Sequence, residues 1–185
     1  MHSWHDVRAE RISPESFLAL IEISKGSKNK YELDKETGHL LLDRVLFTST
    51  HYPHNYGFIP RTYAKDYDPL DVLVLCSEPI LPMSFVACRP IGVLIMTDNG
   101  LMDEKIIAVA TNDPFYNGYY DISDLPDHVL EEIKHFFAVY KTLENKPTAV
   151  NEMKSAEVAK KIIADCMDSY VKLIEPKIKA ERNKK

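Results

Sequence analysis

The pattern of apolar and polar positions divides this 185-residue chain into a β-rich part and a later helical part. Short apolar or alternating runs bounded by polar and turn residues predict strands. These runs lie at residues 17–23, 30–33, 39–44, 72–76, 85–97 and 105–110, and Pro90 interrupts the run at 85–97. Residues 34–38 predict a turn, and Asn99-Gly100 is a pair typical of a hairpin reversal.

Two apolar stripes with helical spacing follow these strands. The first runs from Val129 to Tyr140, and Pro126 suits its first turn. The second is expected to start with Ser155 as its N-cap and to end at Pro176. Residues 177–185 are rich in lysine and predict a solvated basic tail. Strands first and helices afterwards indicate an α+β domain built on a small β-barrel.

Composition narrows the class of protein. The 45% hydrophobic and 28% charged fractions are those of an ordinary globular protein, and we expect a single domain over residues 1–185. A net charge of −5 argues against nucleic acid as a partner, and no apolar stretch reaches membrane-spanning length. Cys76, Cys88 and Cys166 are widely spaced, which favours reduced thiols and a cytoplasmic location.

The densest candidate chemistry is an acidic loop directly before an apolar run. Asp66, Asp68 and Asp71 precede the run at residues 72–75. Carboxylates this close repel one another unless a cation lies among them, and Mg²⁺ prefers oxygen ligands. An EF-hand loop matches poorly, because leucine, aspartate and serine stand where that loop needs a ligand, glycine and glutamate. We therefore interpret the loop as a metal site rather than as a solvated loop.

Two weaker groups accompany the acidic loop. Asp103 and Lys105 share one face of a strand, which fits either a surface salt bridge or a metal–phosphate site. Basic and aromatic residues, each of which alone could be solvated or packed, could together form the cationic half of a phosphate site. They are Lys30, Arg44, the aromatic turn at residues 52–57, Tyr140 and Lys141. His51 and His54 are interpreted as structural.

Taken together, these residues resemble the soluble family I inorganic pyrophosphatases. That family's signature has the form Asp-x-Asp-Pro-x-Asp-Val, which residues 66–72 match. Further matching segments occur in the family's order and span roughly residues 4 to 170. They are residues 22–27, 30–34, 43–44, 52–58, 98, 103–105, 135–137 and 140–141. Residues 4–6, 52–57 and 112–114 are most similar to the plant-like branch.

Two positions depart from the family pattern. Tyr67 stands where the signature usually has a small or polar residue, and Asn99 stands where some members have an acidic residue. Tyr67 is not at a metal-ligand position in the pattern that carries the resemblance, whereas Asn99 removes a possible outer carboxylate. We expect function to survive, with a change confined to loop packing or local access.

The resemblance implies a fold, an activity and a set of site residues. The fold is a closed, OB-like five-stranded β-barrel with two main helices packed against it. The activity is hydrolysis of pyrophosphate to two orthophosphates by a water activated by Mg²⁺, in a homo-oligomer. The implied metal residues are Asp66, Asp71, Asp98 and Asp103, with Glu22 and Glu32 nearer the periphery. Asp68 is implied as the base, Tyr56 as a further catalytic group, and the substrate-binding residues as Lys30, Arg44, Tyr56, Lys105, Tyr140 and Lys141.

Two other functions stay open at this stage. A metal-dependent nucleotide diphosphatase would use similar carboxylates, but it needs a base-stacking or ribose pocket that the sequence does not indicate. An OB-type binding module would bind oligonucleotides. The acidic net charge and the aspartate cluster both count against that module.

Overall fold

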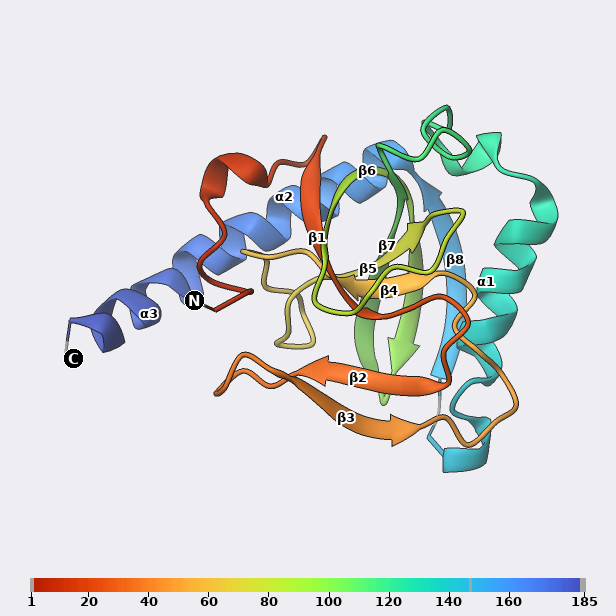
Figure 1. The fold of residues 1–185 in the computed structure, drawn as a ribbon, viewed down its shortest axis with the longest axis horizontal. Helices are drawn as coiled ribbons and strands as arrows, with labels where there is room; N and C mark the ends of the chain where they lie inside the picture. The colour runs from red at the N-terminus through yellow and green to blue at the C-terminus, as the bar shows by residue number, and fades with distance from the viewer. Residues whose placement is uncertain (1, 147, 184–185) are drawn as a thin grey trace.

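Five strands of the main sheet close into a ring. The computed structural model describes residues 2–146 and 148–183. The sheet has the order β1-β4-β5-β7-β6-β8, and β1 pairs with β6 as well as with β4 (Figure 1). The strands are β1 (Phe17–Ile23), β4 (Asn55–Phe58), β5 (Asp71–Leu75), β6 (Phe85–Asp98), β7 (Leu101–Ala110) and β8 (Thr148–Ser155). The predicted closed five-stranded fold is confirmed.

A second, two-stranded sheet lies apart from the ring. It consists of β2 (Asn29–Leu33) and β3 (Leu40–Val45), joined by the predicted turn, in which Gly38 adopts a φ of +73° (Figure 1). Lys30, Glu32 and Arg44 lie on these two strands. This small sheet therefore carries part of the predicted basic group.

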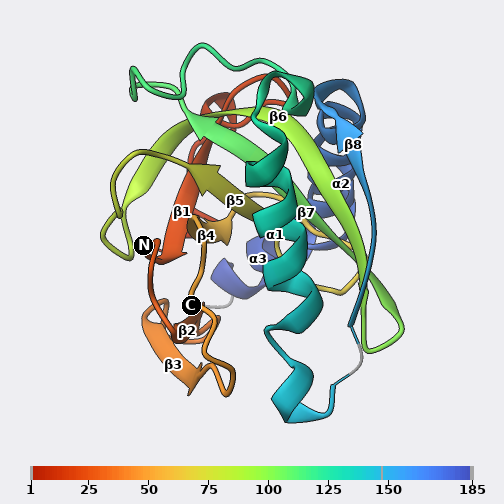
Figure 2. The same ribbon diagram turned by 90° about the vertical axis from the view of Figure 1, so that its right-hand side faces the viewer.

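Two main helices cover different sides of the ring. They are α1 (Asp127–Val139) and α2 (Ala156–Leu173), as Figure 2 shows. Alternate residues of β5 and β7 belong to different core clusters, one packed with α1 and the other with α2. The cluster with α1 joins Ile133, Phe136 and Phe137 to Leu73, Leu75, Ile107 and Val109. The cluster with α2 joins Ala159, Ile163 and Cys166 to Val72, Val74, Ile106 and Ala108. Both strands are continuous apolar runs because both of their faces are buried.

Several elements differ from the sequence prediction. Strand β6 continues through Pro90 with a bulge between Pro90 and Gly92. Strand β4 begins inside the segment predicted as an aromatic turn, and the edge strand β8 was not predicted, because one is very short and the other is largely polar. The Asn99-Gly100 pair forms a two-residue hairpin turn in which both residues have positive φ, as such turns require.

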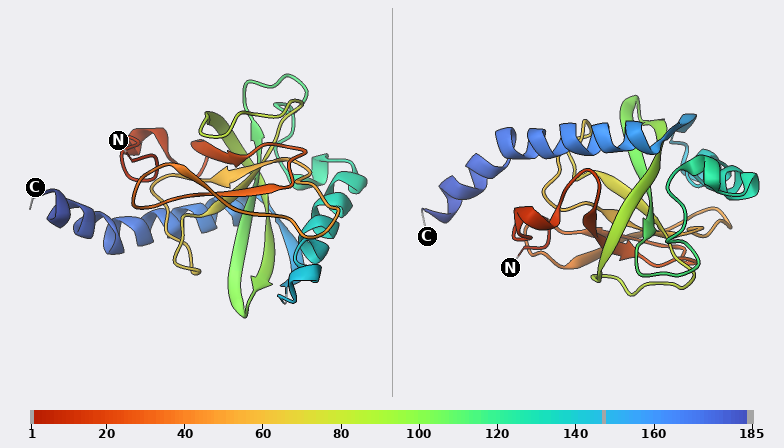
Figure 3. Two further views of the ribbon diagram at one scale, coloured as in Figure 1. Left: turned by 60° about the horizontal axis from the view of Figure 1, so that its bottom comes forward. Right: turned by 90° about the horizontal axis from the view of Figure 1, so that it is seen from above.

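The helix ends also differ in detail. Ser155 is the N-cap of α2, as predicted, but its side chain makes no capping hydrogen bond. Instead, the Ala156 N–H donates to Asp121 Oδ2 at 2.8 Å. After α2 ends, a third helix, α3 (Glu175–Arg182), continues along the same edge of the molecule (Figure 3). The predicted tail is therefore helical, although mostly exposed, and Lys184 and Lys185 lie outside the described residues.

The remaining short elements are three 3₁₀ turns, η1 (Ala9–Arg11), η2 (Ile122–Asp124) and η3 (Thr142–Glu144). Within the described ranges, no helix is long and apolar enough to cross a membrane.

Gly57 permits the close pairing of β1 with β4. A Cβ at this position would lie 1.8 Å from the backbone oxygen of Leu20. Any larger residue would push the two strands apart.

Candidate active site

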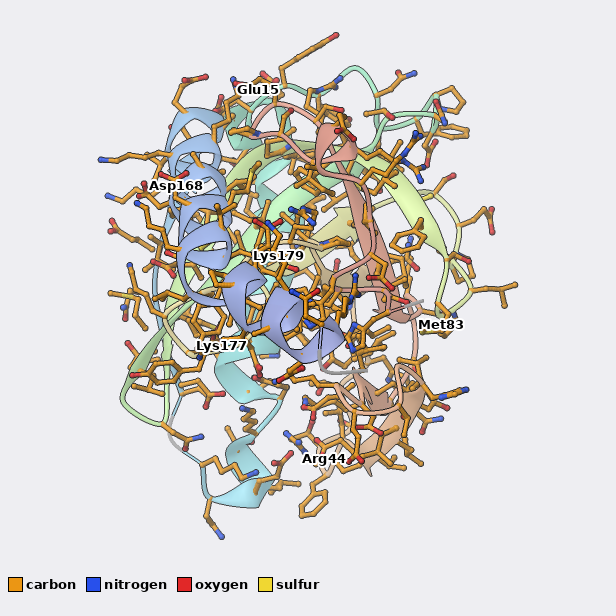
Figure 4. All side chains as sticks on the ribbon, turned by 90° about the vertical axis from the view of Figure 1, so that its left-hand side faces the viewer. Glu15, Arg44, Met83, Asp168, Lys177 and Lys179 are labelled. Atoms are coloured by element: carbon orange, nitrogen blue, oxygen red, sulfur yellow. The ribbon has the colours of Figure 1, made fainter. Side chains whose placement is uncertain are left out.

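One cavity brings together every residue that the sequence analysis proposed for the site. Its volume is about 390 Å³. The proposed residues that line it are Glu22, Lys30, Glu32, Arg44, Tyr56, Asp66, Asp68, Asp71, Asp98, Asp103, Lys105, Tyr140 and Lys141. The ring supplies one wall and the β2–β3 sheet another, and Figure 4 shows Arg44 on this small sheet.

Carboxylates gather where the loop before β5 meets β7. Because β5 and β7 run parallel, Asp71 lies opposite Lys105, and Asp103 shares the face of Lys105 two residues earlier. Burial, followed by the charges of Asp71 and Asp103, raises the pKa of Asp66 to about 6. Burial also raises the pKa of Asp103, against the opposing charge of Lys105. The cavity therefore concentrates negative charge away from water.

Lys105 is the buried cation of this wall. Its Nζ donates to Asp71 Oδ2 at 2.7 Å, to Asp103 Oδ1 at 3.0 Å and to the Tyr56 hydroxyl at 2.9 Å. The Tyr56 hydroxyl in turn donates to Asp71. Burial alone would lower the pKa of Lys105, but Asp71, Tyr56 and Asp103 hold it well above its usual value. Lys105 is therefore charged and bridges two of the predicted metal ligands.

A deeper carboxyl group lies beside this wall. Glu22 is buried on β1 and accepts a hydrogen bond from the Leu33 N–H at 2.7 Å. Burial, reinforced by the charge of Asp71, raises the pKa of Glu22 to about 8. This hydrogen bond also ties β1 of the ring to the end of β2.

Cations line the opposite wall. Lys30 pairs with Glu32 and Asp43, and the Arg44 Nε donates to Glu144 Oε1 at 2.9 Å. In the part of the chain that the structure describes, the buried Nη2 of Arg44 has no hydrogen-bond partner. The Nη1 of Arg44 pairs with Asp43, so the guanidinium is held through two nitrogens, and its third nitrogen, Nη2, is suited to an oxyanion.

Lys141 and Asp98 form a pair at the end of the cavity. The Lys141 Nζ donates to Asp98 Oδ2. Asp98 Oδ1 is buried and has no partner among the described residues. Tyr140, beside Lys141, is 4% exposed, and burial raises the pKa of its hydroxyl, which keeps it protonated.

Asp68 is the most exposed aspartate of the acidic loop, with 51% of its side chain accessible. It lies at the mouth of the cavity and pairs with Lys35, from the turn between β2 and β3. The sequence analysis did not single out Lys35, nor Asp43, Glu144 and Lys146 near Arg44. No local pattern distinguishes these four from solvated charges, because their partners are set by contacts across the fold.

The donor chemistry of the cavity fits a hard divalent cation. Its carboxylates offer only oxygen ligands, and the buried Asp98 Oδ1 lacks a partner among the described residues. Within those same residues, no three acidic, histidine or cysteine side chains form a ready ligand set. Lys105 bridges Asp71 and Asp103, so these carboxylates already share one positive charge.

Carboxylates on one wall and cationic and phenolic groups on the other define the class of site. Groups of this kind, lining one cavity in a closed five-stranded ring, suit an anionic phosphate compound and hard metal ions. The family model described as "Inorganic pyrophosphatase" matches residues 19–171. The chain belongs to the inorganic pyrophosphatase family.

Individual relatives agree with this family. A soluble inorganic pyrophosphatase 2 of Chlamydomonas reinhardtii is 51% identical over 169 residues, covering 91% of this chain and 88% of its own. A soluble inorganic pyrophosphatase 1 of Arabidopsis thaliana is 50% identical over 173 residues, covering 94% and 82%. These algal and plant relatives agree with the predicted plant-like resemblance.

A solved structure agrees as well. The inorganic pyrophosphatase of Thermus thermophilus superimposes with a TM-score of 0.87 at 38% identity, covering 91% of this chain and 98% of its own. That similarity extends over both the ring and the helices that surround it.

Proposed function

We propose that this protein is a Mg²⁺-dependent inorganic pyrophosphatase that hydrolyses pyrophosphate to two orthophosphates. The observation that carries the proposal is the single cavity that unites the acidic loop with the cations of β2, β3 and the end of α1. Residues far apart in the sequence have no reason to converge there for folding alone. The family membership of the chain supports the same activity.

Asp66, Asp71, Asp98 and Asp103 would hold the metal ions, with Glu22 and Glu32 nearer the periphery. When bound, magnesium supplies positive charge for the phosphate oxygens and lowers the pKa of the attacking water. The carboxylates of this wall orient that water. Lys105 balances Asp71 and Asp103, and its bonds to both carboxylates limit how far they can move.

Asp68 would accept the proton of the attacking water. Its half-exposed position at the cavity mouth gives the carboxylate access to water while the backbone stays fixed next to Asp66. A base must lie within hydrogen-bonding reach of the proton that it removes. Tyr56, a further proposed catalytic group, lines the cavity with its hydroxyl held by Asp71 and Lys105.

The cationic wall would bind the phosphate that leaves. Phosphoryl transfer depends mainly on positioning and on neutralising charge. Arg44 offers its Nη2, and Lys30 and Lys141 contribute point charges. The protonated hydroxyl of Tyr140 can donate a hydrogen bond to a phosphate oxygen, whereas Tyr56 already donates to Asp71.

The test is orthophosphate release from pyrophosphate with and without Mg²⁺, with ATP as a parallel substrate. We expect fast release from pyrophosphate that requires Mg²⁺, and little from ATP. Faster release from ATP would indicate a nucleotide hydrolase instead. No release from either substrate would favour a binding module.

Two variants test the residue roles. Asp68→Asn should retain Mg²⁺ binding and the fold while lowering kcat by about 10²- to 10⁴-fold. Asp103→Asn should weaken Mg²⁺ binding, measured by calorimetry with the metal alone. Normal turnover in the first variant, or an unchanged titration in the second, would remove that residue from its role.

We further propose a single catalytic domain that acts in the cytoplasm as a homo-oligomer. Three free, widely spaced cysteines support a reducing compartment. Exposed apolar side chains on β3, Leu41, Leu42 and Val45, are compatible with a contact between subunits. Sedimentation velocity measures the oligomeric state, and a purely monomeric boundary would contradict this part of the proposal.

A further inference from the structure

An ion pair between an exposed lysine and a buried glutamate lies just behind the acidic wall of the cavity. The Lys65 Nζ is 2.5 Å from Glu104 Oε1. The Glu104 side chain is only 4% exposed, whereas that of Lys65 is 66% exposed. An ionised carboxylate this deeply buried needs a cation, and Lys65 supplies it. Neither residue lines the cavity.

Each member of this pair directly adjoins a predicted metal ligand. Lys65 precedes Asp66 in the loop, and Glu104 follows Asp103 on β7. Successive side chains of a strand point to opposite faces, so Asp103 faces the cavity and Glu104 faces away from it. The loop and β7 therefore carry Asp66 and Asp103 on the cavity side. On the opposite side they carry the oppositely charged Lys65 and Glu104.

The two carboxylates inside the cavity push the loop and β7 apart, whereas the ion pair outside the cavity pulls them together. Asp66 and Asp103 both line the cavity, and two like-charged carboxylates in one pocket repel each other. The attraction between Lys65 and Glu104 opposes that repulsion. It acts between the same loop and the same strand.

Apolar side chains of the loop share a core cluster with β7, but among the described residues its other hydrogen bonds and ion pairs do not reach β7. The Tyr63 N–H donates to the Cys166 carbonyl of α2 at 2.9 Å, and the Ala64 N–H donates to the Asp68 carbonyl within the loop at 2.8 Å. The Lys35–Asp68 pair joins the loop to the β2–β3 turn, but both of its side chains are about half exposed. Solvent-exposed pairs of that kind constrain geometry weakly.

We propose that Lys65 and Glu104 are positioning residues whose ion pair sets the spacing between Asp66 and Asp103, and thereby the affinity of the cavity for a divalent cation. The inference rests on the proposed function, because it takes both carboxylates as metal ligands. Groups outside the ligand shell commonly tune metal affinity in this way.

The test is calorimetric titration of the metal-free protein with Mg²⁺ alone, in the wild type and in Lys65→Met. Lys65 is largely exposed, so methionine should be accepted without unfolding. We expect the Kd for Mg²⁺ to rise about threefold to tenfold, at or below the low end for outer-shell partners. Activity at saturating Mg²⁺ should stay near the wild-type kcat. Lys65→Arg, which keeps the charge, should restore the wild-type Kd.

Two further variants separate positioning from general stability. Lys160→Met removes the exposed Lys160–Glu157 pair of α2 and should leave the Kd for Mg²⁺ unchanged. Glu104→Gln should weaken Mg²⁺ binding as Lys65→Met does. The double variant Lys65→Met/Glu104→Gln should weaken it no more than either single change, because one interaction is lost in all three.

Asp103→Asn serves as the reference that distinguishes two kinds of failure. If Asp103→Asn weakens Mg²⁺ binding while Lys65→Met and Glu104→Gln stay within twofold of wild type, the positioning role is overturned and the proposed function stands. If the wild type releases no phosphate and Asp103→Asn binds Mg²⁺ normally, both fail. A lower thermal midpoint with an unchanged Kd would likewise overturn the positioning role.

Discussion

Protonation of His54 should destabilise the fold at acidic pH. His54 is 4% exposed, and both of its ring nitrogens are buried without a hydrogen-bond partner among the described residues. Burial, followed by the charge of Lys25, lowers its pKa from 6.5 to about 4. The folded protein therefore keeps a neutral imidazole over a pH range in which the unfolded chain binds a proton.

The sign and size of the effect follow from this difference in pKa. Because the unfolded state binds more protons between pH 6.5 and 4, the free energy of unfolding falls as the pH falls through that range. His54 should contribute its full stability above pH 6.5. It should lose about 2 kcal/mol of that stability at pH 5 and about 3 kcal/mol below pH 4, at ~1.4 kcal/mol per pKa unit.

The assay is urea unfolding of metal-free wild type and His54→Leu at pH 8 and pH 5, at constant ionic strength. At pH 8 the two proteins should agree within about 1 kcal/mol, because leucine removes two unpartnered polar atoms and keeps an apolar side chain in place. Between pH 8 and pH 5 the wild type should lose about 2 kcal/mol more than the variant. Other titrating groups, such as His5, cancel in this comparison. An equal loss in both proteins would refute the reasoning.

Three further predictions concern Lys105, Tyr67 and the start of α2. Lys105→Met should lower the metal-free unfolding free energy by about 3–5 kcal/mol, since it leaves buried carboxylates unpaired; a loss below about 1 kcal/mol in urea would contradict this. Tyr67 has a φ of +71° and is 68% exposed. Tyr67→Asn should therefore raise the thermal midpoint, with a gain of up to about 1 kcal/mol, and a lower midpoint would count against backbone strain. Asp121→Ala should cost about 1 kcal/mol in urea unfolding and Ser155→Ala much less, because the Ala156 N–H bonds to Asp121; equal losses would contradict that cap.

The sequence predicted most of the fold because elements with a buried face have apolar residues at regular positions. β1, β5 and β7 are apolar runs that lie inside the structure, and α1 and α2 follow their apolar stripes. The prediction missed the elements that lack a periodic pattern of apolar residues. β4 has four residues, and β8 is an edge strand with a polar composition. α3 contains few apolar residues, so the sequence shows no apolar stripe that predicts a helix there.

The candidate site was predicted residue by residue, but its connections were not. The signature at residues 66–72 and the wider resemblance named all of the proposed residues that line the cavity. They did not predict that Lys35 would pair with Asp68, or that Arg44 would be held by Glu144. The partners in the second pair are separated by 100 positions along the chain.

By itself, the sequence determined the strands and helices with a clear period, the acidic loop and the family. Only the tertiary structure decided that β1 also pairs with β6, that Lys105 bridges Asp71 and Asp103, and that Asp121 caps α2. The physical reason is that a local pattern records how strongly each position prefers burial and a given backbone shape. Ion pairs and hydrogen bonds depend instead on which groups lie within about 3 Å of each other. That distance is set only when segments remote in the chain pack together.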